Sequence, residues 1–262
     1  MTSPTRTPPT QEQLDRYRWY HQFSFPNGAK TRPTVDCPDV WEHIEATLLD
    51  VRYYGGREVL DCGSRDCYWA IQACRQSAKH VTAIDITLNP GVAELILPYY
   101  DYPITQLAMN VMDIADGPIF INAFDTIFCA GLLYHLRYPF AALAELAKVL
   151  RPGGLLLIET ALLDKPEVAD MAMLWCPVHE SPYEATSCTF FNTRGLRVTM
   201  ESLGFEELLS APMKRKLHNP PGMDRGTFVY RKARQNEYLR TYWDATASQE
   251  RLDALLQQER AA

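Results

Sequence analysis

The strongest structural signal in this chain is the stretch Glu58-Val59-Leu60-Asp61-Cys62-Gly63-Ser64-Arg65-Asp66-Cys67. Its apolar run stops at an acid and a glycine, which is typical of a buried parallel strand that leads into a tight turn. Residues 68–76 then have helical character, and a second short strand, 81–85, ends at another acid, Asp85. An acid at that position can accept hydrogen bonds from both hydroxyls of a ribose. The stretch therefore predicts a strand, turn and helix that bind a nucleotide.

The glycine content of the turn distinguishes two classes of nucleotide ligand. A dinucleotide fold uses Gly-x-Gly-x-x-Gly so that backbone amides can approach a pyrophosphate. Here Gly63 is present, but Arg65 and Cys67 occupy the next alternate positions. S-adenosylmethionine has a ribose and an adenine but no phosphate, so one glycine, with Asp61 before it near the aminoacyl end, can suffice. The turn therefore favours S-adenosylmethionine over a dinucleotide.

Three segments together resemble class I S-adenosylmethionine-dependent methyltransferases, over roughly residues 55–232. Residues 58–67 look like motif I of that class, residues 123–136 like its fourth strand and exit loop, and residues 149–160 like its helix, Pro-Gly-Gly turn and fifth strand. The continuation Asp66-Cys67-Tyr68 and the exit Leu133-Tyr134-His135-Leu136 look most like the branch that includes bacterial tRNA wobble-uridine carboxymethyltransferases and many small-molecule methyltransferases.

The resemblance implies a cofactor site at the carboxyl edge of the sheet. The residues that we expect to contact S-adenosylmethionine are Asp61, Gly63, Ser64, Asp85, Ile86, Met112, Asp113 and Cys129. Asp113 follows the third predicted strand, where related enzymes place an acceptor for the adenine amino group, although a helix or turn cap is the alternative interpretation. Cys129, like Cys62, lies at a strand end and would also suit a small buried position.

The expected chemistry is an in-line displacement from a sulfonium, so the enzyme mainly has to align the acceptor and exclude water. A base is needed only if the acceptor must lose a proton. His135 leaves the fourth strand at the carboxyl edge, where ligands bind in open α/β folds, and imidazole titrates near neutral pH. We therefore expect His135 to be the catalytic base, with a structural role as the alternative. Tyr134 is the other catalytic candidate, because its ring and hydroxyl could hold the acceptor or the sulfonium region.

Two further regions are expected to contact the acceptor. The aromatic-rich N-terminal arm resembles the cover that related methyltransferases lay over the active site, with ordinary packing of a terminal helix as the alternative. Residues 161–189 have the length and composition of a lid. The predicted substrate-binding residues are Trp19, Tyr20, His21, Arg137, His179 and Tyr183. A metal site built from Asp164, His179 and Glu180 is rejected, because their spacing fits no standard ligand pattern.

The alternation of strands and helices predicts an α/β fold: a Rossmann-like, seven-stranded, mostly parallel sheet with helices on both faces and an antiparallel last strand. The expected strands are 57–61, 80–85, 104–109, 124–129, 154–160, 205–210 and 227–231, and the expected helices are 11–22, 39–53, 66–77, 91–98, 138–150, 193–203 and 235–260. Residues 1–10 are expected to be disordered. The predicted organisation is an arm with helices over the active site (1–54), a methyltransferase domain (55–232, with a lid at about 161–191) and a helical tail (233–262).

Composition limits the partners. The formal net charge is −6 and the isoelectric point is about 5.6, which does not favour a polyanionic partner. The seven cysteines are an odd number without a Cys-x-x-Cys pair, so we expect free thiols in a reducing cytoplasm and no metal site. No apolar run suits a membrane span or a signal peptide. The tail could pack on the domain or against a second subunit, so a homo-oligomer is possible.

We therefore predict a cytoplasmic S-adenosylmethionine-dependent methyltransferase that acts on a small-molecule substrate, with oxygen favoured over nitrogen or carbon as the acceptor atom. The alternative from the same fold is modification of a tRNA wobble uridine, so tRNA is not excluded as a partner. A non-catalytic cofactor-binding partner is a third hypothesis, and the retained Asp61, Gly63, Asp85 and Tyr134-His135 loop count against it. The fourth is an enzyme that keeps the cofactor but catalyses another reaction.

Overall fold

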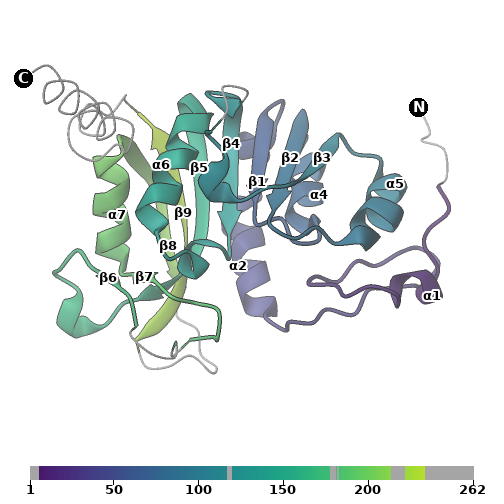
Figure 1. The fold of residues 1–262 in the computed structure, drawn as a ribbon, viewed down its shortest axis with the longest axis horizontal. Coiled ribbons are helices and arrows are strands. Elements are labelled where there is room, and N and C mark those ends of the chain that lie inside the picture. The colour runs from purple at the N-terminus through teal and green to yellow at the C-terminus, as the bar shows by residue number, and fades with distance from the viewer. Residues whose placement is uncertain (1–5, 117–119, 178–180, 182, 214–221, 234–262) are drawn as a thin grey trace, which may run out of the picture.

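The central element is a mixed β-sheet with helices on both faces (Figure 1). The computed structural model describes residues 6–116, 120–177, 181, 183–213 and 222–233. Within these ranges the strands are β1 (Glu58–Cys62), β2 (His80–Asp85), β3 (Ile104–Ala108), β4 (Phe124–Ala130), β5 (Leu150–Leu163), β6 (Leu174–Trp175), β7 (Phe190–Phe191), β8 (Phe205–Met213) and β9 (Met223–Lys232).

The strand order confirms the predicted α/β class. Strands β3, β2, β1, β4 and β5 lie side by side and run parallel. Strand β9 pairs antiparallel with β5, and β8 pairs antiparallel with β9. The short strands β6 and β7 were not predicted, and β7 pairs with Leu162 where β5 extends past the end of β4. All the parallel strands therefore end at one edge, which brings Asp61 and Asp85 together.

Helices and short turns connect the strands. They are α1 (Gln11–Leu14), α2 (Pro38–Leu48), α3 (Val51–Tyr54), α4 (Tyr68–Arg75), η1 (Val92–Ile96), α5 (Leu97–Tyr100), η2 (Val111–Asp113), η4 (Leu133–His135), α6 (Pro139–Val149), η5 (Pro166–Val168) and α7 (Thr193–Ser202). Helix α7 lies within the predicted range 193–203, and Asn192 caps it, because its side chain accepts from the Gly195 amide. In the described residues no helix has the length and apolar character to cross a membrane.

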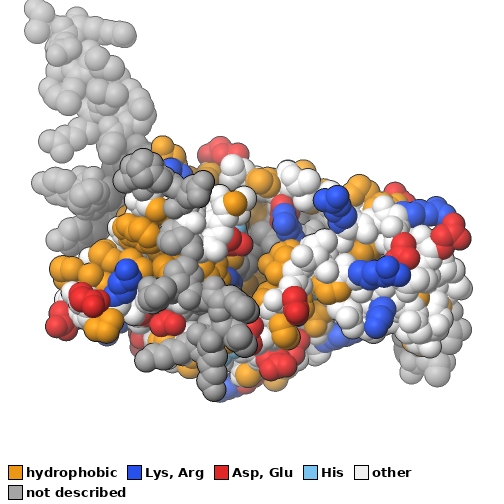
Figure 2. Space-filling model, turned by 90° about the horizontal axis from the view of Figure 1, so that it is seen from below, with side chains coloured by type: hydrophobic (Ala, Val, Ile, Leu, Met, Phe, Trp, Pro, Cys, Tyr) orange, Lys and Arg blue, Asp and Glu red, His pale blue; other side chains and the backbone are white. Residues whose placement is uncertain are grey.

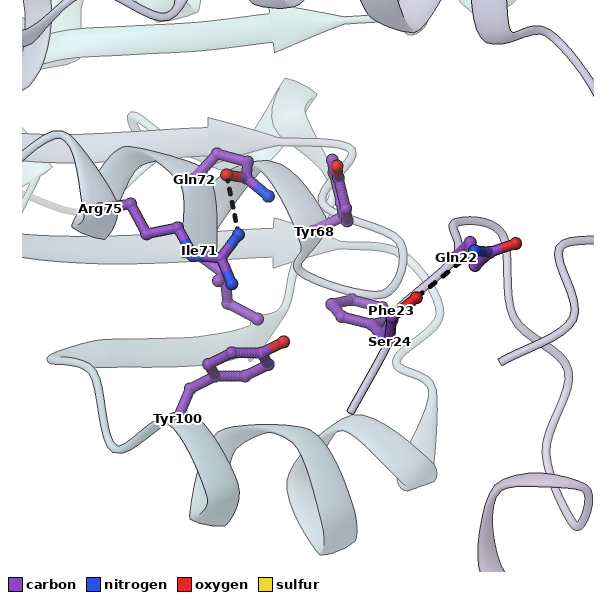
Figure 3. Close-up of a pocket in the computed structure, with 8 residues that line it drawn as sticks. All are labelled: Gln22, Phe23, Ser24, Tyr68, Ile71, Gln72, Arg75 and Tyr100. Carbon is purple, nitrogen blue, oxygen red and sulfur yellow. Dashed lines mark hydrogen bonds between the residues drawn. The ribbon is translucent and has the colours of Figure 1, made fainter. Parts of the chain in front are cut away.

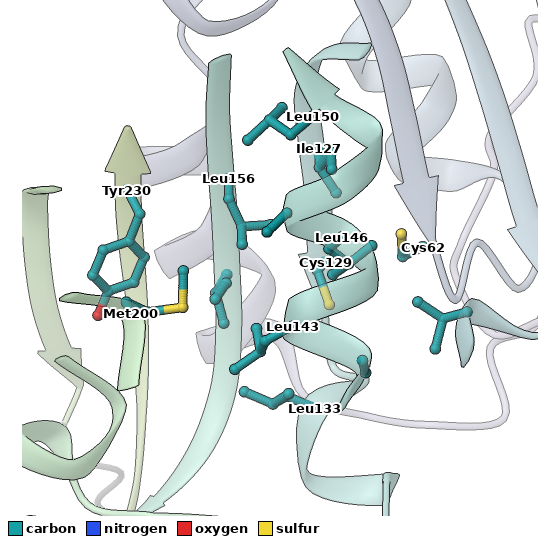
Figure 4. Close-up of a cluster of buried hydrophobic side chains, with 14 of the residues drawn as sticks. Cys62, Ile127, Cys129, Leu133, Leu143, Leu146, Leu150, Leu156, Met200 and Tyr230 are labelled. Atoms are coloured by element: carbon teal, nitrogen blue, oxygen red, sulfur yellow. The ribbon is translucent and has the colours of Figure 1, made fainter. Parts of the chain in front are cut away.

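Successive residues of each strand serve opposite faces of the sheet, because strand side chains alternate. Leu60 of β1 packs into a cluster with Leu143 of α6 and Met200 of α7, part of which is drawn in Figure 4. Its neighbour Val59 packs on the other face, in the cluster that contains Ile44 of α2 and residues of α4 and the N-terminal segment. The sheet is thus covered on both sides, and its carboxyl edge is left for ligands.

Four of the seven cysteines are buried, Cys37 and Cys188 are half-buried, and one is exposed. Cys62 and Cys129 lie next to each other on β1 and β4, in the cluster shown in Figure 4, and burial raises the pKa of the Cys129 thiol to about 12. Cys67 and Cys74 are buried as well, whereas Cys176 is exposed. The buried thiols therefore behave as small apolar side chains.

Several predicted elements of the N-terminal part were wrong. Helix α1 begins at its Thr10 cap but ends at Leu14, and the chain then bends, so that Ser24 and Lys30 form an antiparallel bridge around Gly28, which has φ +83°. The predicted helix 39–53 is divided into α2 and α3 by Asp50, whose side chain caps the second helix. Residues 6–10 are not disordered as expected, because Arg6 donates to the Pro98 carbonyl.

Other boundaries differ towards the carboxyl end. Strand β5 begins at Leu150, before the predicted 154, and continues to Leu163, so the predicted insertion begins later than 161. The predicted helix 91–98 is a π turn, η1, followed by α5. The predicted tail helix, 235–260, lies outside the described residues.

Candidate active site

The turn after β1 has three left-handed residues at alternate positions. Gly63 has φ +72°, Arg65 +54° and Cys67 +59°. The amides of Gly63 and Ser64 both donate to the Ile84 carbonyl, at 2.9 and 3.0 Å, and hold the turn against β2. A left-handed conformation costs a non-glycine residue roughly 1–2 kcal/mol. The loop therefore keeps a Gly-x-Gly-x-Gly shape although two of the three positions carry side chains.

Two acids flank this turn in different hydrogen-bonding states. Asp61 is only 3% exposed, and its Oδ2 has no hydrogen-bond partner among the described residues, nor has the buried Ser64 hydroxyl. Burial raises the pKa of Asp61 to about 8, and the charge of Asp85 adds to this effect. Asp85 is fixed by the amides of Arg65 (2.9 Å) and Thr87 (3.0 Å), one on each oxygen. Each oxygen of Asp85 keeps a lone pair for a hydroxyl donor.

The expected adenine contacts follow β2 and β3. Ile86 is 73% exposed directly after Asp85, which leaves an apolar side chain free at this edge. Met112 is half-buried and Asp113 is exposed on turn η2, which is capped by Asn110 and not by Asp113. Cys129 lies in the core, so the structure does not bring its thiol to this edge.

Asp66 attaches the N-terminal arm to the cofactor loop. It is 1% exposed and accepts from the backbone amides of Tyr20 (2.8 Å) and His21 (2.7 Å), while its other oxygen lies 2.7 Å from His21 Nδ1. The His21 ring also stacks on Tyr68 at a centroid distance of 4.6 Å. Burial alone would raise the pKa of Asp66, but His21 and the two amides outweigh it and hold this pKa below its ordinary value.

The three predicted substrate residues of the arm have different surroundings. Trp19 is 2% exposed, donates its indole N–H to the Leu14 carbonyl and packs against Gly91, so its ring is part of the core. His21 is buried against Asp66. Tyr20 lies with its ring 5.4 Å below the Arg65 guanidinium. Burial raises the pKa of Tyr20 to about 12, with smaller effects from Cys37, Arg225 and other charges. Of these three residues, Tyr20 is the one that contacts the cofactor loop through the Arg65 side chain.

Arg225 on β9 is the centre of a hydrogen-bonded cluster that also contains Glu159, Tyr134 and Tyr183. Its Nε and Nη2 donate to the two carboxylate oxygens of Glu159 on β5, each at 2.6 Å. Its Nη1 donates to the hydroxyls of Tyr134 (3.1 Å) and Tyr183 (2.7 Å). Burial alone would lower the pKa of Arg225, but the Glu159 charge more than compensates and raises it. Because both phenol oxygens accept from Arg225, their own protons are free to donate elsewhere.

His135 lies beside this cluster on turn η4. Its side chain is 30% exposed, with Nδ1 3.2 Å from the Thr186 carbonyl and Nε2 3.4 Å from Glu184 Oε1. A carbonyl can only accept, so Nδ1 carries a proton in this contact, and a neutral imidazole leaves its lone pair on Nε2. Arg137, two residues later, is exposed.

The remaining predicted residues are placed as follows. Tyr183 lies beside Tyr134, with the two ring centroids 5.6 Å apart. Asp164 accepts from both the amide and the hydroxyl of Thr193 at the start of α7, while His179 and Glu180 lie outside the described residues. In the described ranges no three His, Cys, Asp or Glu side chains are arranged to hold a metal ion.

Sequence reasoning missed Asp66, Glu159 and Arg225. Glu159 had a signal, because it is an acid inside the apolar run of β5 and is 1% exposed. Asp66 was named in the motif but given no role of its own, and nothing in the sequence around Arg225 indicates that it is buried.

Two cavities are lined by residues other than the two acids and the Arg225 cluster. The first, of about 190 Å³, lies between the N-terminal segment and helices α4 and α5, and Arg75 points across it toward Tyr100 (Figure 3). The second, of about 410 Å³, is lined by Gly56, Arg57 and Arg151 at the opposite end of the sheet. Figure 2 views the carboxyl-edge side, where basic and acidic side chains of the described residues are interspersed.

The fold and the arrangement of Asp61, Gly63 and Asp85 define a class I S-adenosylmethionine-dependent methyltransferase, the class whose cofactor is S-adenosylmethionine. The chain belongs to the methyltransferase domain family, whose model matches residues 18–210.

Curated relatives include a tRNA U34 carboxymethyltransferase of Methylococcus capsulatus, 37% identical over 126 residues, which are 47% of this chain and 37% of the relative. Another is the tRNA U34 carboxymethyltransferase of Helicobacter pylori strain HPAG1, 30% identical over 182 residues, which are 65% of this chain and 63% of the relative. The chain thus spans less than two thirds of the length of these relatives.

Solved structures share the fold at low identity. The Burkholderia thailandensis 1,6-didemethyltoxoflavin-N1-methyltransferase, crystallised with 1,6-didemethyltoxoflavin and S-adenosylhomocysteine, has a TM-score of 0.58 and 21% identity, and the match covers 75% of this chain and 82% of that one. The [4+2]-cyclase SpnF has a TM-score of 0.56 and 17% identity, with 83% and 86% covered. These likenesses show the fold.

Proposed function

We propose that this chain binds S-adenosylmethionine at the carboxyl edge of β1 and β2 and transfers its methyl group to a small-molecule acceptor. The observation that carries the proposal is the pair of acids at this edge. Asp61 is buried with an unpartnered oxygen, and Asp85 is held by two amides with lone pairs to spare. A buried carboxyl oxygen without a hydrogen-bond partner is costly, so a hydrogen-bonding or cationic ligand group beside Asp61 would be favourable.

The residues at this edge suit the parts of the cofactor. Asp85 would accept from the ribose hydroxyls, while Asp61 and Ser64 would face the ammonium of the aminoacyl end. Ile86 and Met112 offer apolar surface for the adenine, next to Asp113 as the expected partner of its amino group. When bound, S-adenosylmethionine supplies an electrophilic methyl group on a sulfonium.

The acceptor would lie among the phenols of Tyr20, Tyr134 and Tyr183. The Arg225–Glu159 pair orients Tyr134 and Tyr183 so that their O–H groups can donate to an acceptor oxygen. His135 can accept a proton only when its imidazole is neutral. The nitrogen that accepts it is Nε2, which lies on the side of Glu184. An oxygen acceptor suits these donors and this base. The net charge of −6 supports a small molecule over a polyanion.

A second candidate function is modification of a tRNA wobble uridine. The relatives named tRNA U34 carboxymethyltransferase favour it. One further observation is the buried Arg225, whose guanidinium could face the carboxylate of a carboxymethyl group next to Tyr134. That guanidinium is already neutralised by Glu159, which makes the pair weaker support for an additional anion.

Calorimetry with S-adenosylhomocysteine tests the cofactor proposal. Asp85→Ala should weaken binding by about 1–3 kcal/mol, because the ribose hydroxyls lose their acceptors. Asp85→Asn keeps one acceptor oxygen and should lose less, and circular dichroism checks that each variant is folded. Unchanged affinity in a folded Asp85→Ala protein would contradict the assignment.

The choice of acceptor needs a separate experiment. Transfer of a labelled methyl group from S-adenosylmethionine is measured with a panel of hydroxylated small molecules and with unmodified tRNA at several salt concentrations. Labelled tRNA, with an affinity that falls steeply as salt rises, would support the second function instead.

A further inference from the structure

Arg65 keeps a side chain at a position where the backbone favours glycine. Its φ is +54°, and its amide donates to Asp85 Oδ2 at 2.9 Å, so the backbone is fixed in this conformation. Glycine would adopt the same conformation without steric cost. Strain of this kind at a ligand site points to a use for the residue that causes it.

The guanidinium of Arg65 is exposed beside the cofactor loop. It lies 5.4 Å from the centre of the Tyr20 ring, so its position is restricted by the arm that Asp66 holds in place. Within the described ranges Arg65 forms no ion pair. The other charged side chains of the loop, Asp61 and Asp66, are acids. Arg65 is therefore the one cation that segment 61–67 offers to a ligand.

We propose that Arg65 binds the α-carboxylate of S-adenosylmethionine, which rests on the cofactor site proposed above. The carboxylate is the single anionic group of that molecule, whereas the sulfonium and ammonium would be repelled by a guanidinium. The planar fork of arginine can hold a carboxylate with two parallel hydrogen bonds. Arg65 thus complements Asp61: Asp61 would bind the ammonium and Arg65 the carboxylate of the same aminoacyl group.

Two ligands distinguish binding of the carboxylate by Arg65 from a general effect of Arg65 on the cofactor site. S-adenosylhomocysteine carries the aminoacyl carboxylate, and 5′-methylthioadenosine shares the adenosine and the sulfur but lacks the aminoacyl group. By calorimetry, Arg65→Gly should lower the affinity for S-adenosylhomocysteine about 10- to 100-fold, the range for a hydrogen bond to a charged group. The affinity for 5′-methylthioadenosine should change by less than about twofold, since no charged contact is lost.

Three further variants define the controls. Arg65→Lys keeps the charge and should recover part of the lost affinity, while Arg65→Asn tolerates the left-handed backbone without charge and should behave like Arg65→Gly. Arg75→Ala is the matched control, because Arg75 is exposed and lies over the Tyr100 ring at the same 5.4 Å. It should leave the affinity for both ligands unchanged.

The outcomes are distinct. Loss of affinity for S-adenosylhomocysteine alone supports the proposal. If both ligands bind the wild type and Arg65→Gly equally well, or if Arg65→Gly weakens both ligands alike, Arg65 does not serve the carboxylate and the inference fails. If the wild type binds neither ligand, the proposed function fails together with it.

Discussion

Replacing Asp66 by alanine should destabilise the protein by about 3–5 kcal/mol, because it removes a buried acceptor and leaves three hydrogen-bonding partners without it. Asp66 accepts from two backbone amides and from His21, and all three contacts measure 2.7–2.8 Å. Hydrogen bonds to a charged group contribute about 1.5–3 kcal/mol each, so three would total about 4.5–9 kcal/mol, which lies at or above the upper end of this range. The arm can however lift and let water satisfy its amides, which limits the cost.

Separation of the N-terminal arm from the domain would expose apolar side chains. The destabilisation caused by Asp66→Ala should therefore not fall below the stated range. Trp19 and Phe23 are nearly fully buried, and burial of such a side chain contributes about 1.5–3 kcal/mol. Asp66→Asn keeps an acceptor oxygen and should cost less, about 1–2 kcal/mol. Because the pKa of Asp66 is lowered in the folded state, its contribution is present above the ordinary aspartate range near pH 4 and is lost as pH falls through the folded pKa.

The assay combines urea denaturation with amide hydrogen exchange. Denaturation of the wild type, Asp66→Ala and Asp66→Asn gives the change in unfolding free energy, and exchange of the Tyr20 and His21 amides reports the arm directly. The reasoning is refuted if Asp66→Ala costs less than about 1 kcal/mol and both amides keep their wild-type protection. A His21→Ala double-mutant cycle then measures the coupling between His21 and Asp66.

Three other changes probe the carboxyl edge. The wild type should lose stability between pH 6 and 8, because the pKa of Asp61 is raised to about 8 in the folded state. Asp61→Asn should therefore gain about 2 kcal/mol in unfolding free energy relative to the wild type over this range. A difference in unfolding free energy that stays constant from pH 6 to 8 would contradict this. Glu159→Gln should cost about 3–5 kcal/mol in urea denaturation by leaving Arg225 buried without its counter-charge, and Glu159→Gln with Arg225→Met should recover part of the loss. His135→Ala should lower kcat roughly 10²- to 10⁴-fold while calorimetry finds cofactor affinity unchanged; full activity in His135→Asn would show that no base is needed.

The parallel strands of the sheet could be predicted from the sequence, because each depends on a pattern of neighbouring residues. The apolar run that ends at Asp61 predicted β1 to within a residue, and the predicted strand 80–85 matches β2. Helix α7 (Thr193–Ser202) lies within the predicted range 193–203, between its cap Asn192 and Gly204, which has φ +84°. These features need only side-chain alternation, caps and glycine.

The candidate site could be predicted from the sequence only in part, because its contacts join segments that are far apart in the chain. Arg225 meets Glu159 across 66 residues of sequence, and Asp66 meets His21 across 45. The arm was predicted to be a helix up to residue 22, but packing of its aromatic side chains overrides local helix propensity after Leu14. The left-handed conformation of Arg65 could not be predicted either, since non-glycine residues rarely adopt it.

The distribution of the thiols makes the segment before β7 accessible to a spectroscopic probe. Burial raises the pKa values of Cys62, Cys67 and Cys129 and slows their alkylation, because the thiolate is the reactive form. Cys176 is exposed one residue after β6, in the segment predicted to be a lid. A fluorophore maleimide at neutral pH should therefore label Cys176 ahead of the buried thiols. Its emission would then test whether this segment moves when an acceptor binds, without any engineered cysteine.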